Sequence, residues 1–296
     1  MRTFAFMAVL LLSLPAHALE VFATVPEWAA LASAIGGGKV NVFSATHALQ
    51  DPHHVDARPS LIARARRADL VAATGAELEV GWLPVVLRES GNPRIQPGQP
   101  GHFEAAAHVR MLDVPTRLDR AEGDVHAAGN PHIQTDPRNF LKVGEALARR
   151  FAELDPANAA AYRSGFDDFA RGWREALGRW EKQAAPLKGL PVVVQHKSWP
   201  YLLDWLGMKE VAALEPKPGV EPSAAHLSRL VESTKGARMV LRAACDNPRP
   251  AEWFSAKAGG GVPVAVLPFT VGGSEGAKDL FSLFDDTIRR LLEASR

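Results

Sequence analysis

One long amphipathic run constrains the fold of this chain most strongly. Between Pro156 and Pro186 no proline interrupts a pattern that continues for about 30 residues, or about 45 Å of helix. Asp155 suits the N-cap, with Pro156 at the first helical position. A helix this long predicts a rigid link between two lobes, although a long core helix of one domain is the alternative. Its apolar positions recur at spacings of three and four: Tyr162, Phe166, Phe169, Trp173, Leu177 and Trp180.

Alternating strand and helix patterns flank this run on both sides. Such alternation predicts the α/β class, with parallel sheets in two Rossmann-like lobes. We expect the N-terminal lobe at 19–154, the linking helix at 155–185 and the C-terminal lobe at 186–296. The expected strands are 20–24, 40–44 and 69–74 in the first lobe, and 191–195, 211–214, 239–243 and 262–267 in the second.

The segment 91–128 departs from this alternation. It is polar, contains four prolines and has little periodicity. Loops of this length are usually functional or mobile. We therefore expect a mobile loop that carries one short strand near Met111.

The N-terminus has the pattern of a secretory signal peptide. Arg2 precedes an apolar stretch at 4–14, and Ala16-His17-Ala18 offers a cleavage site. The stretch is too short to span a bilayer, and no later run reaches the required ~20 residues. We expect residues 1–18 to be removed and the chain to be exported. No cysteine stands at the cleavage point, as a lipoprotein would require.

Charge and cysteine content exclude some classes of protein. The 34 basic residues nearly balance the 33 acidic ones, which argues against nucleic acid as a partner. Cys245 is the single cysteine, so the chain has no internal disulfide. We interpret Cys245 as a semi-buried thiol rather than a metal ligand.

Three histidines occupy loops where ligands collect in α/β proteins. His53 follows the strand at 40–44, His196 follows the strand at 191–195, and His132 lies in a stiff loop between Pro131 and Pro137. Ligands bind at the carboxyl ends of parallel strands and between lobes. Imidazole is the commonest metal ligand, and zinc accepts three nitrogens. The spacing therefore allows a joint metal site, with scattered loop histidines as the alternative.

Five segments, in order, resemble the metal-binding solute-binding proteins of bacterial zinc and manganese ABC importers, of the ZnuA and TroA type. The resemblance runs from about residue 20 to the C-terminus and implies two α/β lobes joined by one rigid helix, with metal in the cleft. It implies His53, His132 and His196 as ligands, and delivery of the metal to a membrane permease. The segments are 51–59, 74–79 with Trp82, 130–137, 195–201 followed by Leu206-Gly207, and 221–223.

The chain departs from that family where a fourth ligand is often found. The family often supplies a carboxylate after the last strand, and the matching position here is Thr270. Neutral threonine is a poor zinc ligand, so water, Asp279 or Glu275 would complete the site. The loop at 91–128 also lacks the dense histidine tract of many zinc-specific members. Three histidines in this part of the chain are candidates for an auxiliary capture site, or are plain surface residues: His102, His108 and His126.

Three neutral imidazoles favour zinc over manganese, which prefers carboxylate oxygens. We expect a monomeric periplasmic Zn²⁺-binding protein that serves an inner-membrane permease, with a periplasmic metallochaperone as a further partner. The alternatives are a metal buffer or chaperone, a manganese-binding protein, a zinc enzyme and a binding protein for an organic solute. We expect no enzyme, since no carboxylate stands at a known catalytic spacing to the histidines. Glu77 and Glu79 are interpreted as capping residues, or as hydrogen-bond partners of a ligand histidine.

Overall fold

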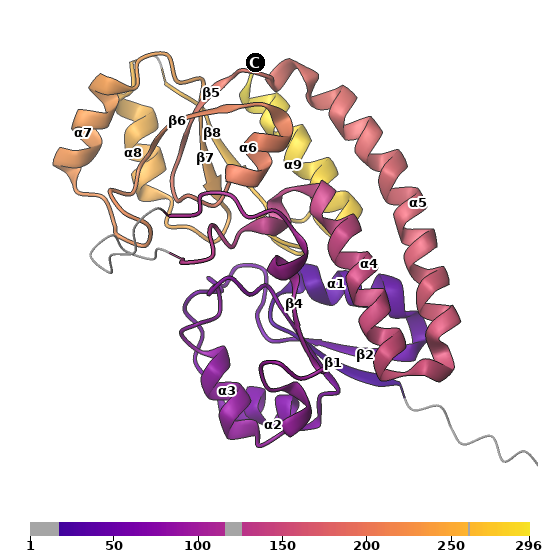
Figure 1. The fold of residues 1–296 in the computed structure, drawn as a ribbon. Helices are drawn as coiled ribbons and strands as arrows, with labels where there is room; N and C mark the ends of the chain where they lie inside the picture. Colours follow the sequence, from indigo (N-terminus) through magenta and orange to yellow (C-terminus); the bar gives the residue numbers. More distant parts are fainter. Residues whose placement is uncertain (1–17, 116–125, 260) are drawn as a thin grey trace, which may run out of the picture.

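The computed structural model describes residues 18–115, 126–259 and 261–296. The predicted signal peptide, apart from Ala18, lies outside these residues. The chain forms two lobes, each built on a four-stranded parallel sheet, with one long helix running along both of them (Figure 1). The predicted fold class, α/β with two parallel sheets and a long helix, is confirmed.

The first sheet has the strand order β2-β1-β3-β4. Its central strand pairs on both sides, since Val21 lies opposite Val42 on one neighbour and opposite Leu70 on the other. β3 is buried along its whole length because helices cover both faces of the sheet. The strands are β1 Leu19–Ala23, β2 Val40–Ser44, β3 Leu70–Ala73 and β4 His102–Glu104.

The second sheet repeats this arrangement, with the order β6-β5-β7-β8. Val192 to Val194 of its central strand are completely buried, which explains why this part of the sequence is a continuous apolar run. The strands are β5 Pro191–Val194, β6 Lys209–Ala213, β7 Met239–Ala243 and β8 Val264–Leu267. In both sheets the chain leaves each strand toward the cleft between the lobes.

The segment 91–128 contains more regular structure than its sequence predicts. β4 pairs with β3 through Phe103 opposite Ala72, and completes the first sheet. The strand expected near Met111 therefore lies earlier, at 102–104, and 3₁₀ turns stand before and after it at Pro93–Ile95 and Ala105–His108. The sequence conceals β4 because three residues are too short to show a period. Residues 116–125 of this segment lie outside the described part.

Helices cover the sheets, and several begin at a proline, which suits the first helical turn because it lacks an N–H. The N-terminal lobe carries α1 Pro26–Gly36, α2 Pro59–Arg67 and α3 Leu83–Ser90. The C-terminal lobe carries α6 Pro200–Leu206, α7 Ala224–Ser233, α8 Arg249–Lys257 and α9 Leu280–Ala294. Between them lie α4 Pro137–Leu154 and α5 Ala159–Ala184.

The long helix begins later than its sequence suggests. A 3₁₀ turn, Pro156–Asn158, precedes α5, and another, Ala185–Leu187, follows it. Asp155 does not cap α5. Its carboxylate instead accepts hydrogen bonds from the side-chain amide of Asn158 at 2.7 Å and from the hydroxyl of Tyr162 at 2.8 Å. These bonds fix the corner at which α4 turns back into α5.

Aromatic side chains hold α5 against α4 and α9. Trp173 and Trp180 are completely buried, and their rings meet edge to face at 5.0 Å. The indole of Trp173 donates to the carbonyl of Pro137 at 2.7 Å, and that of Trp180 donates to Asp285 at 2.6 Å. The two tryptophans therefore tie the long helix to α4 and to the C-terminal helix α9.

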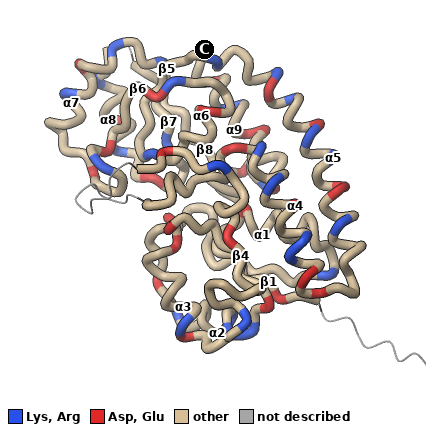
Figure 2. Tube along the Cα trace, in the orientation of Figure 1, with Lys and Arg blue, Asp and Glu red and all other residues tan. Residues whose placement is uncertain are grey.

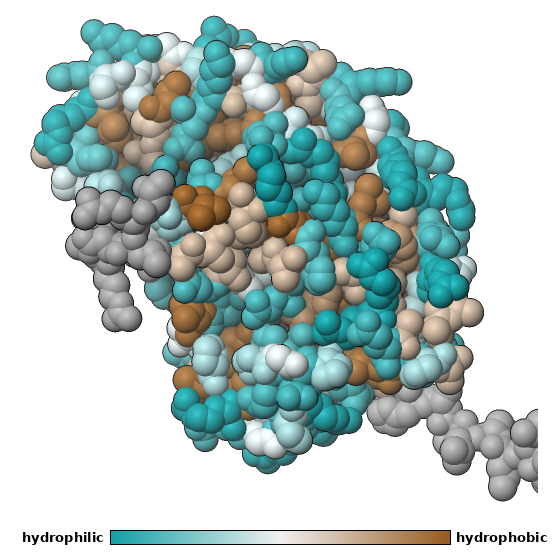
Figure 3. Space-filling model, in the orientation of Figure 1, coloured by the Kyte–Doolittle hydropathy of each residue, from teal (hydrophilic) through white to brown (hydrophobic). Residues whose placement is uncertain are grey.

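The surface agrees with the balanced composition. Basic and acidic residues alternate along α5 (Figure 2). On the face shown in Figure 3, hydrophilic residues cover the long helix, while apolar residues emerge between the lobes. Within the described residues, no helix combines the length and apolarity that crossing a membrane requires.

Candidate metal centre

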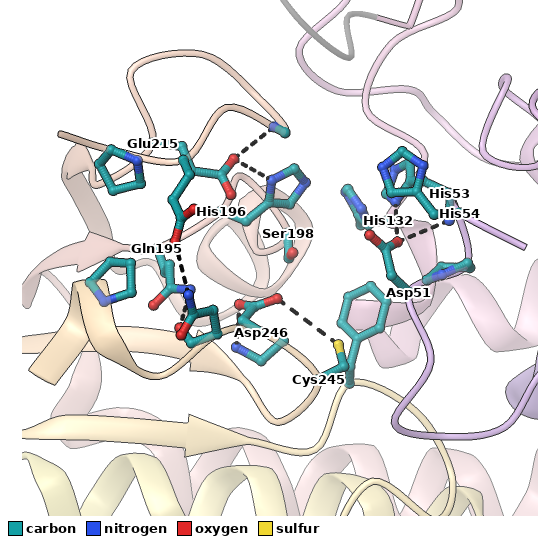
Figure 4. Close-up of a pocket in the computed structure, with 18 residues that line it drawn as sticks. Asp51, His53, His54, His132, Gln195, His196, Ser198, Glu215, Cys245 and Asp246 are labelled. Atoms are coloured by element: carbon teal, nitrogen blue, oxygen red, sulfur yellow. Dashed lines mark hydrogen bonds and ion pairs between the residues drawn. The ribbon is translucent and has the colours of Figure 1, made fainter.

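The three histidines expected to be ligands meet in the cleft between the lobes. One ring nitrogen from each of His53, His132 and His196 lies within 4.8 Å of the other two. His53 comes from the loop between β2 and α2, His132 from the loop before α4, and His196 from the turn after β5. Figure 4 shows the three side chains converging from opposite sides of the cleft.

His53 is oriented by the residue two positions before it. Its Nδ1 lies 2.8 Å from Oδ1 of Asp51, and its backbone N–H donates to the same oxygen at 2.9 Å. The preceding carbonyl, of Pro52, accepts from the buried indole of Trp82 at 3.0 Å. Burial would raise the pKa of Asp51, but the hydrogen bonds and charge of His53 outweigh it and lower this pKa to about 2. This carboxyl therefore stays ionised beside the ring.

His132 is held in the same manner by an amide. Its Nδ1 lies 2.8 Å from Oδ1 of Asn130, which also accepts from the backbone N–H of His132 at 3.0 Å. The loop reaches this shape through Gly129, whose φ is +110°. A Cβ at Gly129 would lie 2.7 Å from the carbonyl of Leu112, so only glycine fits there.

His196 is oriented by a carboxylate from its own lobe. Its Nδ1 lies 2.7 Å from Oε2 of Glu215, which follows β6. That oxygen also accepts from the backbone N–H of Gly219 at 2.8 Å. Glu215 is 18% exposed and His196 15%, so this pair is only weakly screened by solvent.

The contacts at Nδ1 leave the other ring nitrogen of each histidine for a ligand. A histidine that binds metal through Nε2 usually donates Nδ1–H to such an acceptor, which fixes its tautomer and orientation. Nε2 of His53 is buried and, in the described part of the chain, has no hydrogen-bond partner. A small cation between the rings would satisfy it.

The ring separations also fit a tetrahedral ion. The three ring centroids lie 5.3, 5.3 and 5.9 Å apart. With zinc–nitrogen bonds of about 2.0–2.1 Å, imidazoles on a tetrahedral ion have ring centres about 5 Å apart. The three residues thus suit a divalent ion with only a small contraction.

His132 and His196 differ in their affinity for protons. Burial, followed by the neighbouring histidines, lowers the pKa of His132 well below 6.5. Burial also lowers the pKa of His196, but the hydrogen bond and charge of Glu215 outweigh it, and the net pKa is raised. Protons therefore compete with a metal at His196 before they compete at His132.

The three histidines line a cavity of about 340 Å³. The wall that the C-terminal lobe contributes is acidic and contains Cys245. Burial raises the pKa of Asp246 to about 6 and that of the Cys245 thiol to about 12. Cys245 is half-buried, and its Sγ lies 4.0 Å from Oδ1 of Asp246. At neutral pH this thiol is protonated, and a metal ion could bind it only by displacing that proton.

The residues expected to supply a fourth ligand lie elsewhere. Thr270 is buried, and its hydroxyl donates to Oε2 of Glu27 at 2.6 Å, so it bonds across the lobes instead of facing the histidines. Asp279 is the N-cap of α9 and accepts from the backbone N–H of Ser282 at 2.8 Å. Glu275 is exposed. Of the described residues, the cavity lining includes none of these three candidates.

The expected auxiliary histidines separate into two groups. The ring of His126 stacks on that of His53, with centroids 5.5 Å apart. His102 instead bonds within its own lobe, to the carbonyl of Ile95 and to Glu104. His108 stacks on Phe103, with ring centroids 5.0 Å apart. Only His126, of the three, lies beside the metal-type cluster.

Sequence reasoning missed the residues that orient the histidines. Glu79 hydrogen-bonds Thr24 and the backbone N–H groups of the turn after β3, while Glu77 accepts from the backbone of Ala127. Glu79 thus acts as a cap of backbone N–H groups, as one interpretation expected, and in the described residues neither carboxylate is hydrogen-bonded to one of the three histidines. Two of the actual partners had a local signal, since Asp51 and Asn130 each stand two residues before a histidine. Glu215 had none, because it reaches His196 from the loop after a neighbouring strand, β6.

Two α/β lobes around a cluster of three histidines define a two-lobed binding protein with a metal-type donor set in its cleft. The model of the family described as ZnuA, zinc-uptake complex component A, periplasmic, matches residues 21–294. The chain therefore belongs to the ZnuA family, and the predicted resemblance is confirmed.

The relatives of the chain include proteins named for two different metals. The zinc-binding lipoprotein AdcA of Streptococcus pneumoniae is 25% identical over 219 residues, which are 68% of this chain and 40% of AdcA. The manganese ABC transporter substrate-binding lipoprotein PsaA of Streptococcus anginosus is 21% identical over 273 residues, 88% of this chain and 83% of PsaA. The chain thus spans less than half the length of AdcA.

A solved structure shares the fold. The solute-binding protein FpvC of Pseudomonas aeruginosa, in complex with Mn²⁺, superposes with a TM-score of 0.77 at 22% identity, covering 93% of this chain and 98% of FpvC. The names of these relatives describe a zinc-binding lipoprotein, a substrate-binding lipoprotein of an ABC transporter and a solute-binding protein, and none of the three names describes an enzyme.

Proposed function

We propose that this chain binds Zn²⁺ in the periplasm through Nε2 of His53, His132 and His196, and delivers it to an ABC-type permease of the inner membrane. The observation that carries the proposal is the trio of nitrogens within 4.8 Å, each ring held at Nδ1 by a separate acceptor. Such an arrangement fixes all three tautomers for binding through Nε2.

Zinc is favoured over manganese because the donor set is all nitrogen. Manganese prefers carboxylate and water oxygens, whereas imidazole suits zinc. The charge of the ion is balanced without a ligand carboxylate, because Asp51 and Glu215 stand behind two of the rings. Water completes the coordination in this proposal, since Thr270 is engaged by Glu27.

His126 is proposed as an auxiliary capture residue. Its ring stacks on His53 and is partly exposed, so an ion entering the cleft can meet it before the buried His132. An export signal at residues 1–18, a monomeric state and a periplasmic metallochaperone as a further partner belong to the same proposal.

Competition with a chromophoric chelator tests the zinc site in the purified chain. We expect one tightly bound Zn²⁺ per chain, with Mn²⁺ bound more weakly. His132→Ala should lower the zinc affinity by more than about 10–100-fold, which is the loss typical when a hydrogen-bond partner of a ligand is removed. His54→Ala is the matched control, because His54 also lines the cavity but stays outside the cluster. Tighter binding of Mn²⁺ than of Zn²⁺ would overturn the choice of metal.

Growth under zinc limitation separates delivery from buffering. A strain without this chain should require added zinc when a chelator is present, and the wild-type gene should remove that requirement, whereas the His132→Ala gene should not. A metal buffer without a permease would leave growth under the chelator unchanged.

A further inference from the structure

Trp82, in the N-terminal lobe, makes a hydrogen bond to the loop that carries His53. Its indole N–H donates to the carbonyl of Pro52 at 3.0 Å. Trp82 is 1% exposed and Pro52 is also buried, so water has little access to this bond. Because a buried carbonyl without a partner is costly, the indole holds the peptide group that joins Pro52 to His53.

The residue before Trp82 contacts the same loop on the other side of His53. A Cβ at Gly81 would lie 3.2 Å from the carbonyl oxygen of His53, so the two backbones are closely packed. The carbonyl before His53 is therefore bonded by Trp82, and the carbonyl after it rests against Gly81.

The segment that leads to the indole begins with a strained turn after β3. Three successive residues have a positive φ: +77° at Gly75, +49° at Ala76 and +65° at Glu77. This conformation costs energy for the two residues that have a Cβ, and it persists only where neighbouring contacts enforce it. Glu79 supplies such contacts, because its carboxylate accepts from the backbone N–H of Thr74 at 2.8 Å and from that of Gly75 at 3.1 Å. The indole thus stands on a fixed base.

Asp51 and Trp82 act on different parts of the His53 loop. Asp51 accepts from the backbone N–H of His53 and lies 2.8 Å from Nδ1, but it is half-exposed and belongs to the same loop. Trp82 belongs to the buried apolar cluster of the lobe, together with Phe22 of β1 and Val71 of β3. Asp51 therefore orients the ring within the loop, whereas Trp82 fixes the loop to the lobe.

We propose that Trp82 is a positioning residue for His53. Its indole holds the Pro52 carbonyl so that His53 stands in place opposite His132 and His196 before an ion arrives. A ligand that is already in place does not have to be ordered when the ion binds, and this raises the affinity. The inference rests on the proposed function, because it concerns the binding of Zn²⁺ by His53. It adds a residue that touches neither the ion nor the ring.

Trp82→Phe tests this role in the whole chain, since it keeps an aromatic ring and removes the N–H. One net hydrogen bond corresponds to about a 5-fold change in an equilibrium, so the zinc affinity in a chelator competition should fall about 5-fold. Trp180→Phe is the matched control, because that indole is also completely buried and donates to Asp285 at 2.6 Å, between two helices without a candidate ligand. It should keep the wild-type affinity.

The His53→Ala background separates positioning from general damage to the fold. If Trp82 acts through His53, Trp82→Phe should leave the zinc affinity of His53→Ala unchanged, because the ligand that it positions is absent. Isothermal titration with Zn²⁺ measures these weaker variants, which keep two imidazoles. A similar loss of affinity in the His53→Ala background would overturn the proposal, and so would a wild-type affinity of the Trp82→Phe single variant.

Gly81→Ala replaces Trp82→Phe if that variant does not fold. Its Cβ would press on the His53 carbonyl and should lower the zinc affinity of the wild-type chain but not that of His53→Ala. Gly38→Ala is its control, because a Cβ there meets no atom within 4 Å. A wild-type affinity of Gly81→Ala would then overturn the role of this segment. Failure of the unaltered chain to bind zinc would instead overturn the proposed function, and the inference with it.

Discussion

Glu27 at the start of α1 makes a buried contact between the lobes whose strength depends on pH. The side chain is 2% exposed, and Oε2 accepts from the hydroxyl of Thr270 at 2.6 Å. Burial raises its pKa from 4.5 to about 7; the Thr270 hydrogen bond opposes this rise, and the nearby Glu79 adds to it. The folded chain therefore holds a proton on Glu27 that the unfolded chain releases at lower pH.

The sign and size of the effect follow from these two values. An acid whose pKa is raised on folding stabilises the folded state fully below pH 4.5, and this contribution is lost as the pH rises through 7. The difference between 4.5 and about 7 corresponds to about 3 kcal/mol at 1.36 kcal/mol per pKa unit. Glu27→Gln stays neutral and retains an oxygen for Thr270. At pH 8 we expect it to be about 3 kcal/mol more stable than the wild type, and at pH 4 about equal.

Urea unfolding of the metal-free chain at pH 4 and pH 8, followed by tryptophan fluorescence, measures this difference. Glu145→Gln on the exposed face of α4 is the control, and should change the free energy of unfolding by no more than about 0.5 kcal/mol at either pH. The reasoning would be refuted if Glu27→Gln were less stable than wild type at pH 8, or if its free energy of unfolding differed from that of wild type by the same amount at both pH values.

Two further predictions concern the cavity. Zinc affinity should fall as the pH drops through the pKa of His196, which is raised above 6.5. Glu215→Gln should move this loss of affinity to lower pH, and should weaken zinc binding at pH 8 by about 10–100-fold. An unchanged pH profile in a chelator competition would contradict the role of Glu215. The Cys245 thiol, with a pKa near 12 instead of 9, should have a thiolate fraction at pH 8 roughly 1000-fold below that of an ordinary thiol. Iodoacetamide labelling of Cys245, followed by mass spectrometry, should therefore be slow. Labelling as fast as that of glutathione would contradict the raised pKa of this thiol.

The sequence predicted the parts of the fold that have a long or repeated pattern. Alternating apolar strands and helices indicated two parallel sheets, and the aromatic spacing indicated the long helix. β4 was misplaced because it spans three residues and gains its stability from pairing with β3. The start of α5 was misplaced because the Asp155 carboxylate bonds Tyr162, a contact that spacing alone does not reveal.

The candidate site was predictable only where its chemistry is local in sequence. Each histidine follows a strand or stands in a proline-rich loop, and the structure places all three within reach of one ion. Glu215 was missed because its partner lies on another element, 19 residues away. Thr270 follows the last strand, β8, but its hydroxyl faces Glu27, a direction that depends on the packing of both lobes.

Zinc K-edge X-ray absorption of the chain loaded with one equivalent of Zn²⁺ tests the central claim most directly. The site described here predicts a first shell of nitrogen and oxygen at about 2.0–2.1 Å, with multiple scattering from three imidazoles and no sulfur. The same measurement on His132→Ala should lose one imidazole. A shell with fewer than three imidazoles, or a zinc–sulfur distance of about 2.3 Å from Cys245, would contradict the three-histidine site.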